Sequence, residues 1–396
     1  MSDLTVERYT YVTTGSESGA TTVASFTDGK GIFMQVMYGE DGSPSSTNFS
    51  YGHMYATPAD GSVGIFVSFG TGGQLGRYVG AGNVNDDLWI FGTDGSTPVV
   101  QGDVTMTSTT LEVDFTTTEA GHTFEILLFK GPAELEVTLW EALLTDTSVD
   151  GAPSEPNLVF ATTNQIGAPG VFAGSGGSNR FAFGFCANDA GTPDEASIVS
   201  MFDDQTCSNG DTILSWAVFP QIPRLDITSF NADGFNCTGA GGGGVAGLMI
   251  QTNGDVAVTS HIKADTVTTS DTESLPDAGF DNVGLVMVAS CARDHTLTVE
   301  GGLAMHGVGV CTDSGSTHHY ASRIGSAYAC AVEDGVFTKG ADNSSNTYEG
   351  TIPGPDRQPT ITWVDASAFN LRINLLYVEV ASAAVATDPV WIPMVM

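Results

Sequence analysis

The chain has 396 residues, with 46 Asp and Glu against 12 Lys and Arg, and a formal net charge of −34. This balance argues against nucleic-acid binding, which needs clustered Lys and Arg to displace counterions, and the same negative field repels anionic membranes. A hydrophobic fraction of 41% is ordinary for a folded protein, so the 49 glycines are expected in turns rather than in disordered segments.

The size of the net charge also bears on the setting in which the protein works. Self-repulsion from a charge of −34 is tolerable where salt screens it, since the Debye length falls to about 3 Å at 1 M salt. The charge is therefore consistent with a saline, halophilic setting, and equally with a merely acidic and soluble surface.

The beginning of the sequence, MSDLTVERY, contains an acidic residue and no apolar run of the kind that a secretory signal needs. No segment approaches the roughly 20 apolar residues of a membrane-spanning helix. We expect synthesis in a cytoplasm and no membrane insertion. The protein could still leave the cell as part of an assembled particle.

The first third of the chain predicts buried strands separated by turns. Residues 33–38 form a first apolar run, residues 63–69 a glycine-containing strand, and residues 111–115 with 124–129 a closing pair. Asp-Gly and Asn-Gly pairs, which favour tight turns, lie between such runs throughout the sequence. Strands and hairpins are therefore expected to dominate the fold.

Residues 133–144 are the best candidate for a helix. Glu134, Glu136 and Thr138 alternate there with Leu135, Val137 and Leu139, however, and alternation of this kind is typical of a half-buried strand. An edge or linking strand is as consistent with the segment as a helix.

The middle and last thirds of the chain repeat one another. The segment ITSFNADGFN at 227–236 returns as ITWVDASAFN at 361–370, and each copy carries an earlier apolar run, at 158–161 and at 283–289. A tandem duplication returns several features in the same order, as happens here. Each copy is expected to contain an apolar strand, a glycine strand, a cysteine-bearing strand and a closing strand.

Cysteines support the same duplication. Cys186 matches Cys311 and Cys207 matches Cys330. One hypothesis is that Cys186 with Cys207, and Cys311 with Cys330, lie on neighbouring strands and form disulfides, which leaves Cys237 and Cys291 free. The alternative is that all six are buried thiols, because free Cys is among the most buried residue types.

These patterns predict an all-β fold of three tandem antiparallel β-sandwich modules with jelly-roll-like topology. The expected modules are residues 1–131, 132–254 and 255–385, followed by an apolar tail at 386–396. The first module has no cysteine and is supported by its hydrophobic pattern alone.

The sequence contains no recognised catalytic array, because neither an HExxH nor a GxSxG motif occurs. Residues 313–320 are the most polar segment and could line a pocket, although a solvated loop is the simpler interpretation. The pair Asp203 and Asp204 could serve a glycosidase, but 46 acidic residues produce such pairs without any catalytic role. We expect no enzymatic activity and no organic cofactor.

One acidic turn could hold a structural Ca²⁺ or Mg²⁺, which prefer oxygen ligands. The candidate ligands are Asp342, Ser344, Asn346 and Glu349. The segment lacks the central glycine and the spacing of an EF-hand loop, so a solvated turn is the alternative.

Four segments together resemble a β-module of structural proteins from tailed viruses of bacteria and archaea. The glycine strand at 181–187 and the closing segment at 227–235 carry the resemblance, and the segments at 304–312 and 361–369 carry it more weakly. The resemblance covers the last two modules, and it implies a virion component such as a tail fibre, turret or capsid-surface protein. Such a protein would be a homo-oligomer with other virion proteins as partners, and could contact a host surface glycan or protein.

The apolar tail is a candidate docking strand for such a partner, because apolar residues beyond a completed module need a surface to cover them. The residues expected to dock are Val390, Trp391, Ile392, Met394 and Val395. Packing of the tail onto the third module is the alternative.

Two other functions share the expected fold. A carbohydrate-binding or adhesin module would present an aromatic platform, for which the candidates are Trp140, Trp216, Trp363, Trp391, Tyr38, Tyr51 and Tyr55. Most of these residues lie in apolar strands, so a position in the core is the alternative. A polysaccharide-degrading tail enzyme would need a specific pair of carboxylates. If the repeated strands are framework, recognition belongs where the copies differ, in residues 43–51, 239–244 and 313–320.

Overall fold

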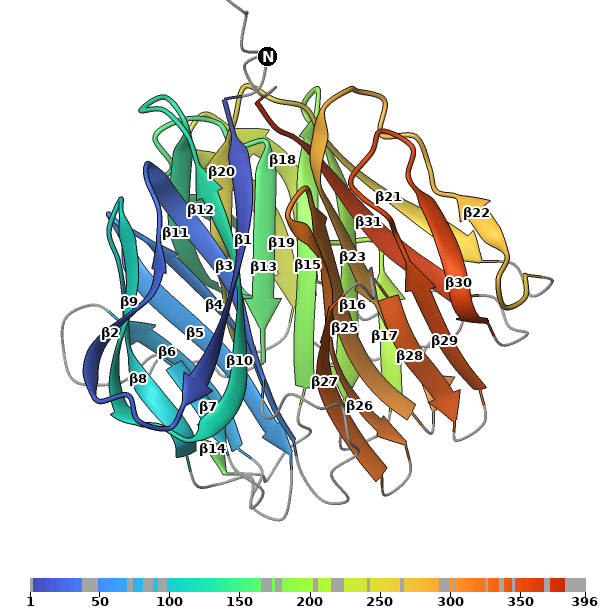
Figure 1. Cartoon of the computed structure of the whole chain (residues 1–396). Helices are drawn as coiled ribbons and strands as arrows, with labels where there is room; N and C mark the ends of the chain where they lie inside the picture. The colour runs from blue at the N-terminus through green and yellow to red at the C-terminus, as the bar shows by residue number, and fades with distance from the viewer. Residues whose placement is uncertain are drawn as a thin grey trace, which may run out of the picture.

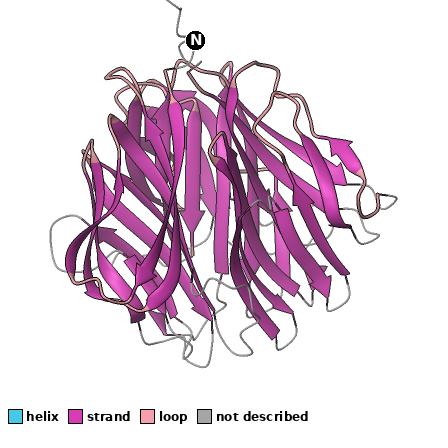
Figure 2. Ribbon diagram, in the orientation of Figure 1, coloured by secondary structure: helices cyan, strands magenta, loops and turns pink. Residues whose placement is uncertain are grey.

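The computed structural model describes residues 3–37, 49–69, 74–80, 88–91, 98–164, 173–174, 180–201, 206–214, 224–240, 243–263, 267–291, 300–301, 303–324, 327–334, 338–343, 346–366 and 371–381. These residues form 31 β-strands in six antiparallel sheets (Figures 1 and 2). The predicted all-β class is confirmed, and the sheets pair into three sandwich-like modules, each with a large and a small sheet.

Module 1 contains strands β1 to β10. Its large sheet has the order β1 (Thr5–Thr14), β10 (Ala120–Lys130), β3 (Gly29–Met37), β4 (Phe49–Thr57), β5 (Gly61–Phe69) and β6 (Gln74–Gly80). Its small sheet has the order β2 (Gly19–Ser25), β9 (Thr110–Thr117), β8 (Pro98–Met106) and β7 (Leu88–Phe91).

Modules 2 and 3 repeat this arrangement. The large sheet of module 2 has the order β11 (Glu136–Leu143), β20 (Gly244–Gln251), β13 (Leu158–Thr163), β15 (Arg180–Asp189), β16 (Thr192–Met201) and β17 (Thr206–Gly210), and its small sheet β12 (Ser148–Asp150), β19 (Gly234–Ala240) and β18 (Arg224–Asn231). In module 3 the large sheet is β21 (Val256–Lys263), β31 (Leu371–Glu379), β23 (Val283–Ser290), β25 (Leu303–Thr312), β26 (Gly315–Ile324) and β27 (Ala327–Asp334), and the small sheet β22 (Thr272–Ser274), β30 (Thr360–Ala366), β29 (Asn346–Thr351) and β28 (Thr338–Asn343).

All three modules share one topology, including the first, which only a hydrophobic pattern had indicated. In each, the last strand of the large sheet inserts between the first and the third strand of the module. Strands β3 to β6 then follow one another within a single sheet, as do β13, β15, β16 and β17 in module 2. The jelly-roll-like topology expected from the sequence is not shown by this order.

Short strands also connect the modules. Strand β14 (Ala173–Gly174) belongs by sequence to module 2 but pairs with β6 of module 1 (Figure 1). Strand β24 (Glu300–Gly301) of module 3 pairs in the same way with β17 of module 2. Each of these modules thus extends the large sheet of the module before it.

The position of each strand explains its hydrophobic pattern. Strands β13 and β23 are buried at every residue, because one face of their sheet is covered by the small sheet and the other by neighbouring modules. This is the environment expected for an uninterrupted apolar run. Strand β11, by contrast, lies at a sheet edge and is mostly half-buried, so the segment at 133–144 contains an edge strand and not a helix.

One hydrophobic core is shared by all three modules. It contains Phe33 of module 1, Phe160 of module 2 and Met287 of module 3, together with neighbours from each large sheet. Modules 1 and 2 have a second, separate core between their own large and small sheets. The inner faces of the three large sheets therefore pack against one another (Figure 1).

The first described residues connect all three modules. The Asp3 carboxylate accepts hydrogen bonds from Thr252 Oγ1 at 2.8 Å and from the Asn253 amide N–H at 3.0 Å, at the end of module 2. Leu4 is fully buried in the shared core, and its carbonyl accepts the amide N–H of Ala381, beyond the last strand of module 3, at 2.6 Å. The arrangement of modules is therefore closed.

The sheets change between β10 and β11 and again between β20 and β21, at residues 131–135 and 252–255. The division into separate domains at residues 131 and 254 stays a prediction, because the shared core crosses these boundaries.

The repeated sequence that indicates the duplication is not structurally equivalent in its two copies. Residues 227–236 span the hairpin of β18 and β19, both in the small sheet of module 2. In residues 361–370 the first part lies in β30, which pairs with β22 just as β19 pairs with β12. Strand β30 is thus the counterpart of β19, and the segment at 227–236 is no closing strand.

The predicted position of the glycine strand in module 1 is also wrong. Residues 63–69 lie in β5, but the counterpart of β15 and β25 is β4, the strand next to β3. Both β4 and β5 contain glycine among apolar residues, so composition does not distinguish them.

The cysteine matches, in contrast, mark equivalent strands. Cys186 and Cys311 lie on β15 and β25, and Cys207 and Cys330 lie on β17 and β27. Each proposed disulfide would have to span an intervening strand, β16 or β26, so the two cysteines are not on neighbouring strands as expected. The five cysteines whose side chains are described are buried thiols outside any disulfide, in agreement with the alternative of buried thiols.

Candidate functional site

Aromatic side chains from the three modules meet at the centre of the shared core. Tyr51 of β4, Phe181 of β15 and His306 of β25 occupy equivalent places in their modules. The ring centroids lie 5.3 Å apart for Tyr51 and Phe181, 5.2 Å for Tyr51 and His306, and 4.9 Å for Phe181 and His306. We call this place the three-module junction.

A buried hydrogen-bond chain crosses the junction from module 1 to module 2. Tyr51 Oη donates to Gln35 Oε1 at 2.8 Å and lies 2.7 Å from His53 Nε2. His53 Nδ1 lies 3.0 Å from Thr162 Oγ1, which is 2.6 Å from Tyr55 Oη. Every group is satisfied if neutral His53 carries its proton on Nε2, so that Thr162 donates to Nδ1 and Tyr55 donates to Thr162; the network assigns this tautomer.

Module 3 contributes three more buried histidines. His306 on β25 and His319 on β26 are fully buried, and neither ring nitrogen of either residue has a hydrogen-bond partner. His306 lies opposite Ala321 and His319 lies opposite Val308, so both project from the inner face of the sheet. His318, next along β26, projects toward the small sheet instead.

Burial controls the charge state of these side chains. Desolvation lowers the pKa of His306 to about 3 and the pKa of His319 to about 3, and neighbouring positive charge lowers both further. Desolvation also lowers the pKa of His53 well below its usual value and raises the pKa of Tyr51. The histidines are therefore neutral at neutral pH, and a substrate cannot reach them in this conformation.

A pocket of about 460 Å³ lies at the seam between modules 1 and 2. It is walled by the start of β3, the turn between β4 and β5, and the linker at 131–138. Its charged lining residues are Asp28, Lys30 and Glu136, and Glu136 accepts a hydrogen bond from Ser154. Among the described residues that line it, none is His or Cys, and the pocket offers space for a small ligand or a partner side chain.

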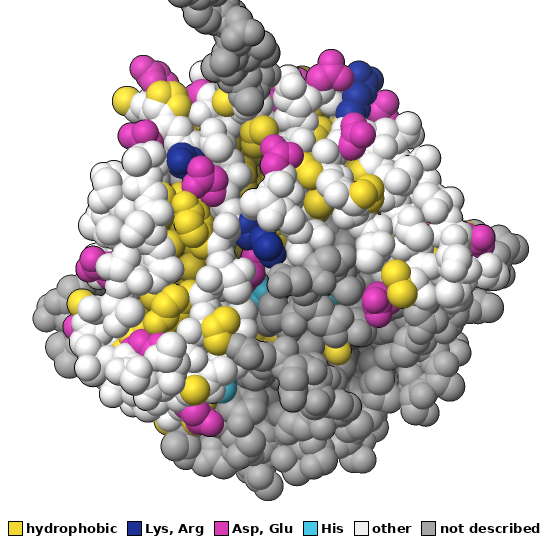
Figure 3. All heavy atoms as spheres, in the orientation of Figure 1, with side chains coloured by type: hydrophobic (Ala, Val, Ile, Leu, Met, Phe, Trp, Pro, Cys, Tyr) yellow, Lys and Arg dark blue, Asp and Glu magenta, His cyan; other side chains and the backbone are white. Residues whose placement is uncertain are grey.

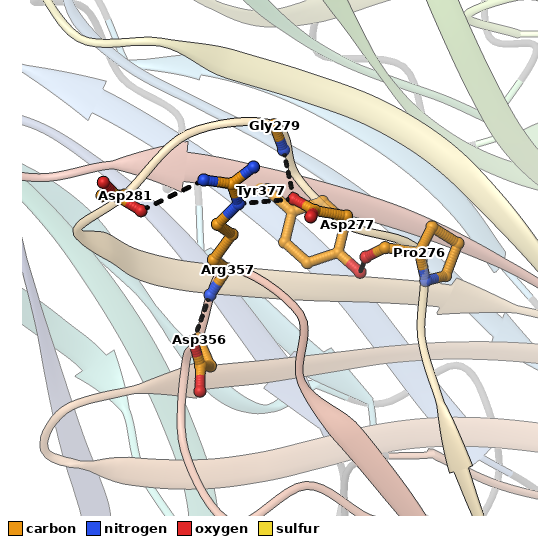
Figure 4. Close-up of polar contacts among 7 residues, drawn as sticks. All are labelled: Pro276, Asp277, Gly279, Asp281, Asp356, Arg357 and Tyr377. Carbon is orange, nitrogen blue, oxygen red and sulfur yellow. Dashed lines mark hydrogen bonds and ion pairs between the residues drawn. The ribbon is translucent and has the colours of Figure 1, made fainter.

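A surface ion-pair group with three charged residues lies in module 3 (Figure 4). Arg357 Nε lies 2.8 Å from Asp277 Oδ1, and Arg357 Nη1 lies 3.3 Å from Asp281 Oδ1. Beneath this group, Tyr377 Oη donates to the Pro276 carbonyl at 3.0 Å. The pairs are exposed, so they contribute little stability, but they join the loop before β30 to the loop between β22 and β23.

The predicted metal ligands lie on or near the hairpin of β28 and β29. Asp342 is on β28, Asn346 and Glu349 are on β29, and Ser344 lies outside the described residues. Glu349 is paired across the hairpin with Lys339. In the described part of the chain no group of three or more His, Cys, Asp or Glu side chains is arranged to hold a metal, and the proposed Ca²⁺ or Mg²⁺ site stays a prediction.

The expected solvated loop at 313–320 is wrong for most of its length. Only residues 313–314 form a turn, which is exposed together with Gly315, and residues 316–320 of β26 are buried. The polar residues of that segment are therefore part of the module interior. The apolar residues of β25 are the feature of the sequence that could have indicated the burial of residues 316–320, because a second strand pairs with β25 there.

The other proposed recognition segments are placed as follows. Several of the predicted segments lie outside the described residues: 43–48, 241–242, the docking residues Val390 to Val395, and the pair Asp203 and Asp204. Tyr51 is fully buried at the junction. Gly239 lies at the end of β19, where an added Cβ would come within 1.7 Å of the Leu144 carbonyl, so this part of the glycine segment serves close packing.

The aromatic residues proposed as a sugar-binding platform are buried wherever their side chains are described. Trp140, Trp363, Tyr51 and Tyr55 all lie in the protein interior. Trp216, Trp391 and Tyr38 lie outside the described residues. The described candidates therefore do not form an exposed platform.

On the described part of the face shown in Figure 3, acidic side chains are scattered singly or in small groups. Lys and Arg are few on this face, as the composition requires. Within the described residues no helix is long and apolar enough to cross a membrane.

Comparison of the sequence with models of known protein families and with curated proteins finds no match.

Proposed function

We propose that the chain is a non-enzymatic structural protein of a virus particle, exposed on the particle as a tail fibre, turret or capsid decoration, with a part in host attachment. The observation that carries the proposal is the closed arrangement of three copies of one sandwich around a shared core. A body of this kind has a rigid interior and leaves its loops and sheet edges for contacts with other proteins.

The character of the polar residues supports a structural role. The histidines of the junction are fully buried, and the residues that line the described pocket include neither His nor Cys. The viral β-module resemblance of residues 181–187 and 227–235 falls on β15 and on the β18–β19 hairpin, both of which are framework strands. Resemblance in framework indicates a related architecture rather than a shared active site.

The partners in this proposal are other virion proteins and further copies of the chain. Val390, Trp391, Ile392, Met394 and Val395 would dock on a partner by strand addition or by filling an apolar groove. Deleting residues 388–396 should abolish incorporation into particles while thermal unfolding stays unchanged. Normal incorporation of the truncated chain would reject the docking role.

The experiment that tests the function is mass spectrometry of particles banded on a density gradient from a culture that makes the protein. We expect the chain in stoichiometric amount with the major particle proteins, and labelled antibody bound to the outside of intact particles. Recovery only in the unassembled soluble fraction would contradict the proposal.

A further inference from the structure

The three-module junction contains a group of histidines that the proposed structural role does not use. The rings of His53 and His306 lie 5.7 Å apart, across the boundary between modules 1 and 3. His319 lies opposite Val308, two residues from His306, and is therefore the diagonal neighbour of His306 on the same face. All three are fully buried.

Among the described side chains, no carboxylate is ion-paired with any of the three histidines, and the buried Glu125 of β10 lies on the same face as His53, two strands away and opposite Gln35. Toward this group face Tyr51 and Tyr55 of β4, Gln35 of β3, Thr162 of β13, and Phe181 and Phe183 of β15. Among the described residues, the charged groups that lower the pKa of the three histidines are one another, His318, and Arg8 of β1. Arg8 is itself paired with the buried Glu125 of β10 at 3.4 Å.

Strand β27 lies next to β26 and carries two acidic residues at register positions near this group. Val332 is opposite His319, whereas Glu333 is opposite His318 and Asp334 is opposite Thr317. Glu333 is therefore the cross-strand partner of His318, and Asp334 is at the diagonal position from His319. The direct partners of His306 and His319 are Ala321, Val308 and Val332.

The fold itself does not require histidine at these positions. Tyr51 and Phe181 stand where module 3 has His306. The place of His319 is taken by Ile65, opposite His53, in module 1 and by Ile198, opposite Phe183, in module 2. Apolar or aromatic side chains fill the same places twice, so the histidines add a property that packing alone does not need.

We propose that the three-module junction is an acid-sensitive contact: protonation of His306 and His319 lets water enter between the modules and loosens the junction while each sandwich keeps its sheets. A buried charge without a partner is strongly unfavourable. The sheets within each module are joined by continuous backbone ladders, whereas the junction is joined mainly by side-chain packing and by a few hydrogen bonds such as those of Thr162. The junction is therefore where hydration relieves the charge with the least disruption.

The direction of the pH effect follows from burial. Desolvation places the pKa of His306 and of His319 at about 3 in the closed junction, below the ordinary histidine value of 6.5. The stability that neutral histidine contributes is fully present above about pH 6.5 and is lost progressively as the pH falls from there toward 3. Acid, not base, should open the contact.

The test is hydrogen exchange of the full chain, followed by mass spectrometry from pH 7 to pH 4 at constant ionic strength and corrected for intrinsic exchange rates. Peptides from β4, β15 and β25 should lose protection as the pH falls, before peptides from β9 and β30 in the small sheets. Far-UV circular dichroism should retain the strand signal at the pH where junction protection is lost.

Two substitutions taken from the other modules make the test specific. His306→Phe and His319→Ile, combined, should shift the midpoint of junction opening downward by about one pH unit or more, that is, to a tenfold higher proton concentration. His261→Gln is the matched control, because His261 lies outside the junction and is 3.6 Å from the Glu273 carboxylate; its midpoint should equal that of the wild type.

Three results would overturn the proposal: full junction protection down to pH 4, an unchanged midpoint in the double variant, or simultaneous loss of protection in the large and small sheets. If the double variant fails to fold at pH 7, the midpoint of junction opening is measured for His319→Ile alone, since isoleucine occupies this position in both other modules. Protonation of the many carboxylates occurs in every variant and cancels in the comparison of midpoints.

Discussion

At the scale of single residues, a half-buried carboxyl group joins the large and small sheets of module 2, alongside the backbone bridge between Leu214 and Leu225. Glu195 of β16 in the large sheet accepts the amide N–H of Ile227 in the small sheet at 2.6 Å and the amide N–H of Ile213 at 2.8 Å. Burial is the largest influence on this carboxyl and raises its pKa to about 8, although both hydrogen bonds oppose the shift. Glu195 thus connects the two layers of module 2, and its raised pKa means that the neutral carboxyl is favoured over the carboxylate in the folded protein.

The raised pKa predicts a specific pH dependence. The stability contributed by protonated Glu195 is fully present below about pH 4.5 and is lost as the pH rises through 8. Relative to Glu195→Gln, the wild type should therefore lose about 2–4 kcal/mol of unfolding free energy between pH 5 and pH 9. Urea unfolding at both pH values measures the difference. Asp194→Asn, at the exposed neighbouring position, should leave the pH profile as in the wild type; equal profiles for Glu195→Gln and the wild type would refute the assignment.

At the scale of strands, close backbone approach decides where side chains are allowed. Trp140 of β11 reaches over Gly247 of β20, and its indole Nε1 donates to the Phe160 carbonyl of β13 at 3.2 Å. The pairing of β13 with β20 is interrupted at this place, between the Val159–Met249 and Thr162–Ala246 pairs. A side-chain donor here replaces the backbone donor of the ladder.

This arrangement predicts that Gly247 tolerates no side chain. An added Cβ would come within 1.7 Å of the Phe160 carbonyl oxygen, so Gly247→Ala must separate β13 from β20 and break the indole hydrogen bond. We expect a loss of about 2–4 kcal/mol in unfolding free energy, measured by chemical denaturation. Gly354→Ala, where an added Cβ meets nothing within 4 Å, should change stability by less than about 0.5 kcal/mol and serves as the control. A small effect at both sites would contradict the packing argument.

At the scale of the whole molecule, the modules depend on one another. The inner faces of their large sheets share one core. Just before β1, Asp3 is hydrogen-bonded to the end of module 2 and Leu4 to the end of module 3. An isolated sandwich would expose the inner face of its large sheet to water. A contiguous exposed apolar face of a whole sheet promotes association.

Residues 132–254 alone should therefore fail to form a stable monomer. We expect the isolated segment to aggregate or to self-associate in light scattering coupled to size exclusion, whereas the full chain remains folded under the same conditions. A monomeric, cooperatively unfolding fragment would show that the modules are autonomous domains.

The net charge predicts the response of the whole molecule to salt. Screening reduces the repulsion within a body of charge −34, so the melting temperature should rise by about 5 °C or more between 0.1 and 2 M NaCl. A variant with the exposed acids Asp114, Glu119, Glu134 and Asp189 changed to amides should show a smaller rise. A melting temperature that is insensitive to salt in both proteins would argue against a halophilic setting.

The sequence by itself determined the all-β class, the three repeated modules, the burial of strands such as β13 and β23, and the equivalence of the cysteine positions. Hydrophobic period and turn residues act locally, so they can be recognised without knowing which strands pair. Only the tertiary structure decided that residues 227–236 form a hairpin of the small sheet, that His318 and His319 are interior, and that one core unites the modules. These features depend on which faces of distant strands meet, and a two-residue alternation identifies a face without identifying what covers it.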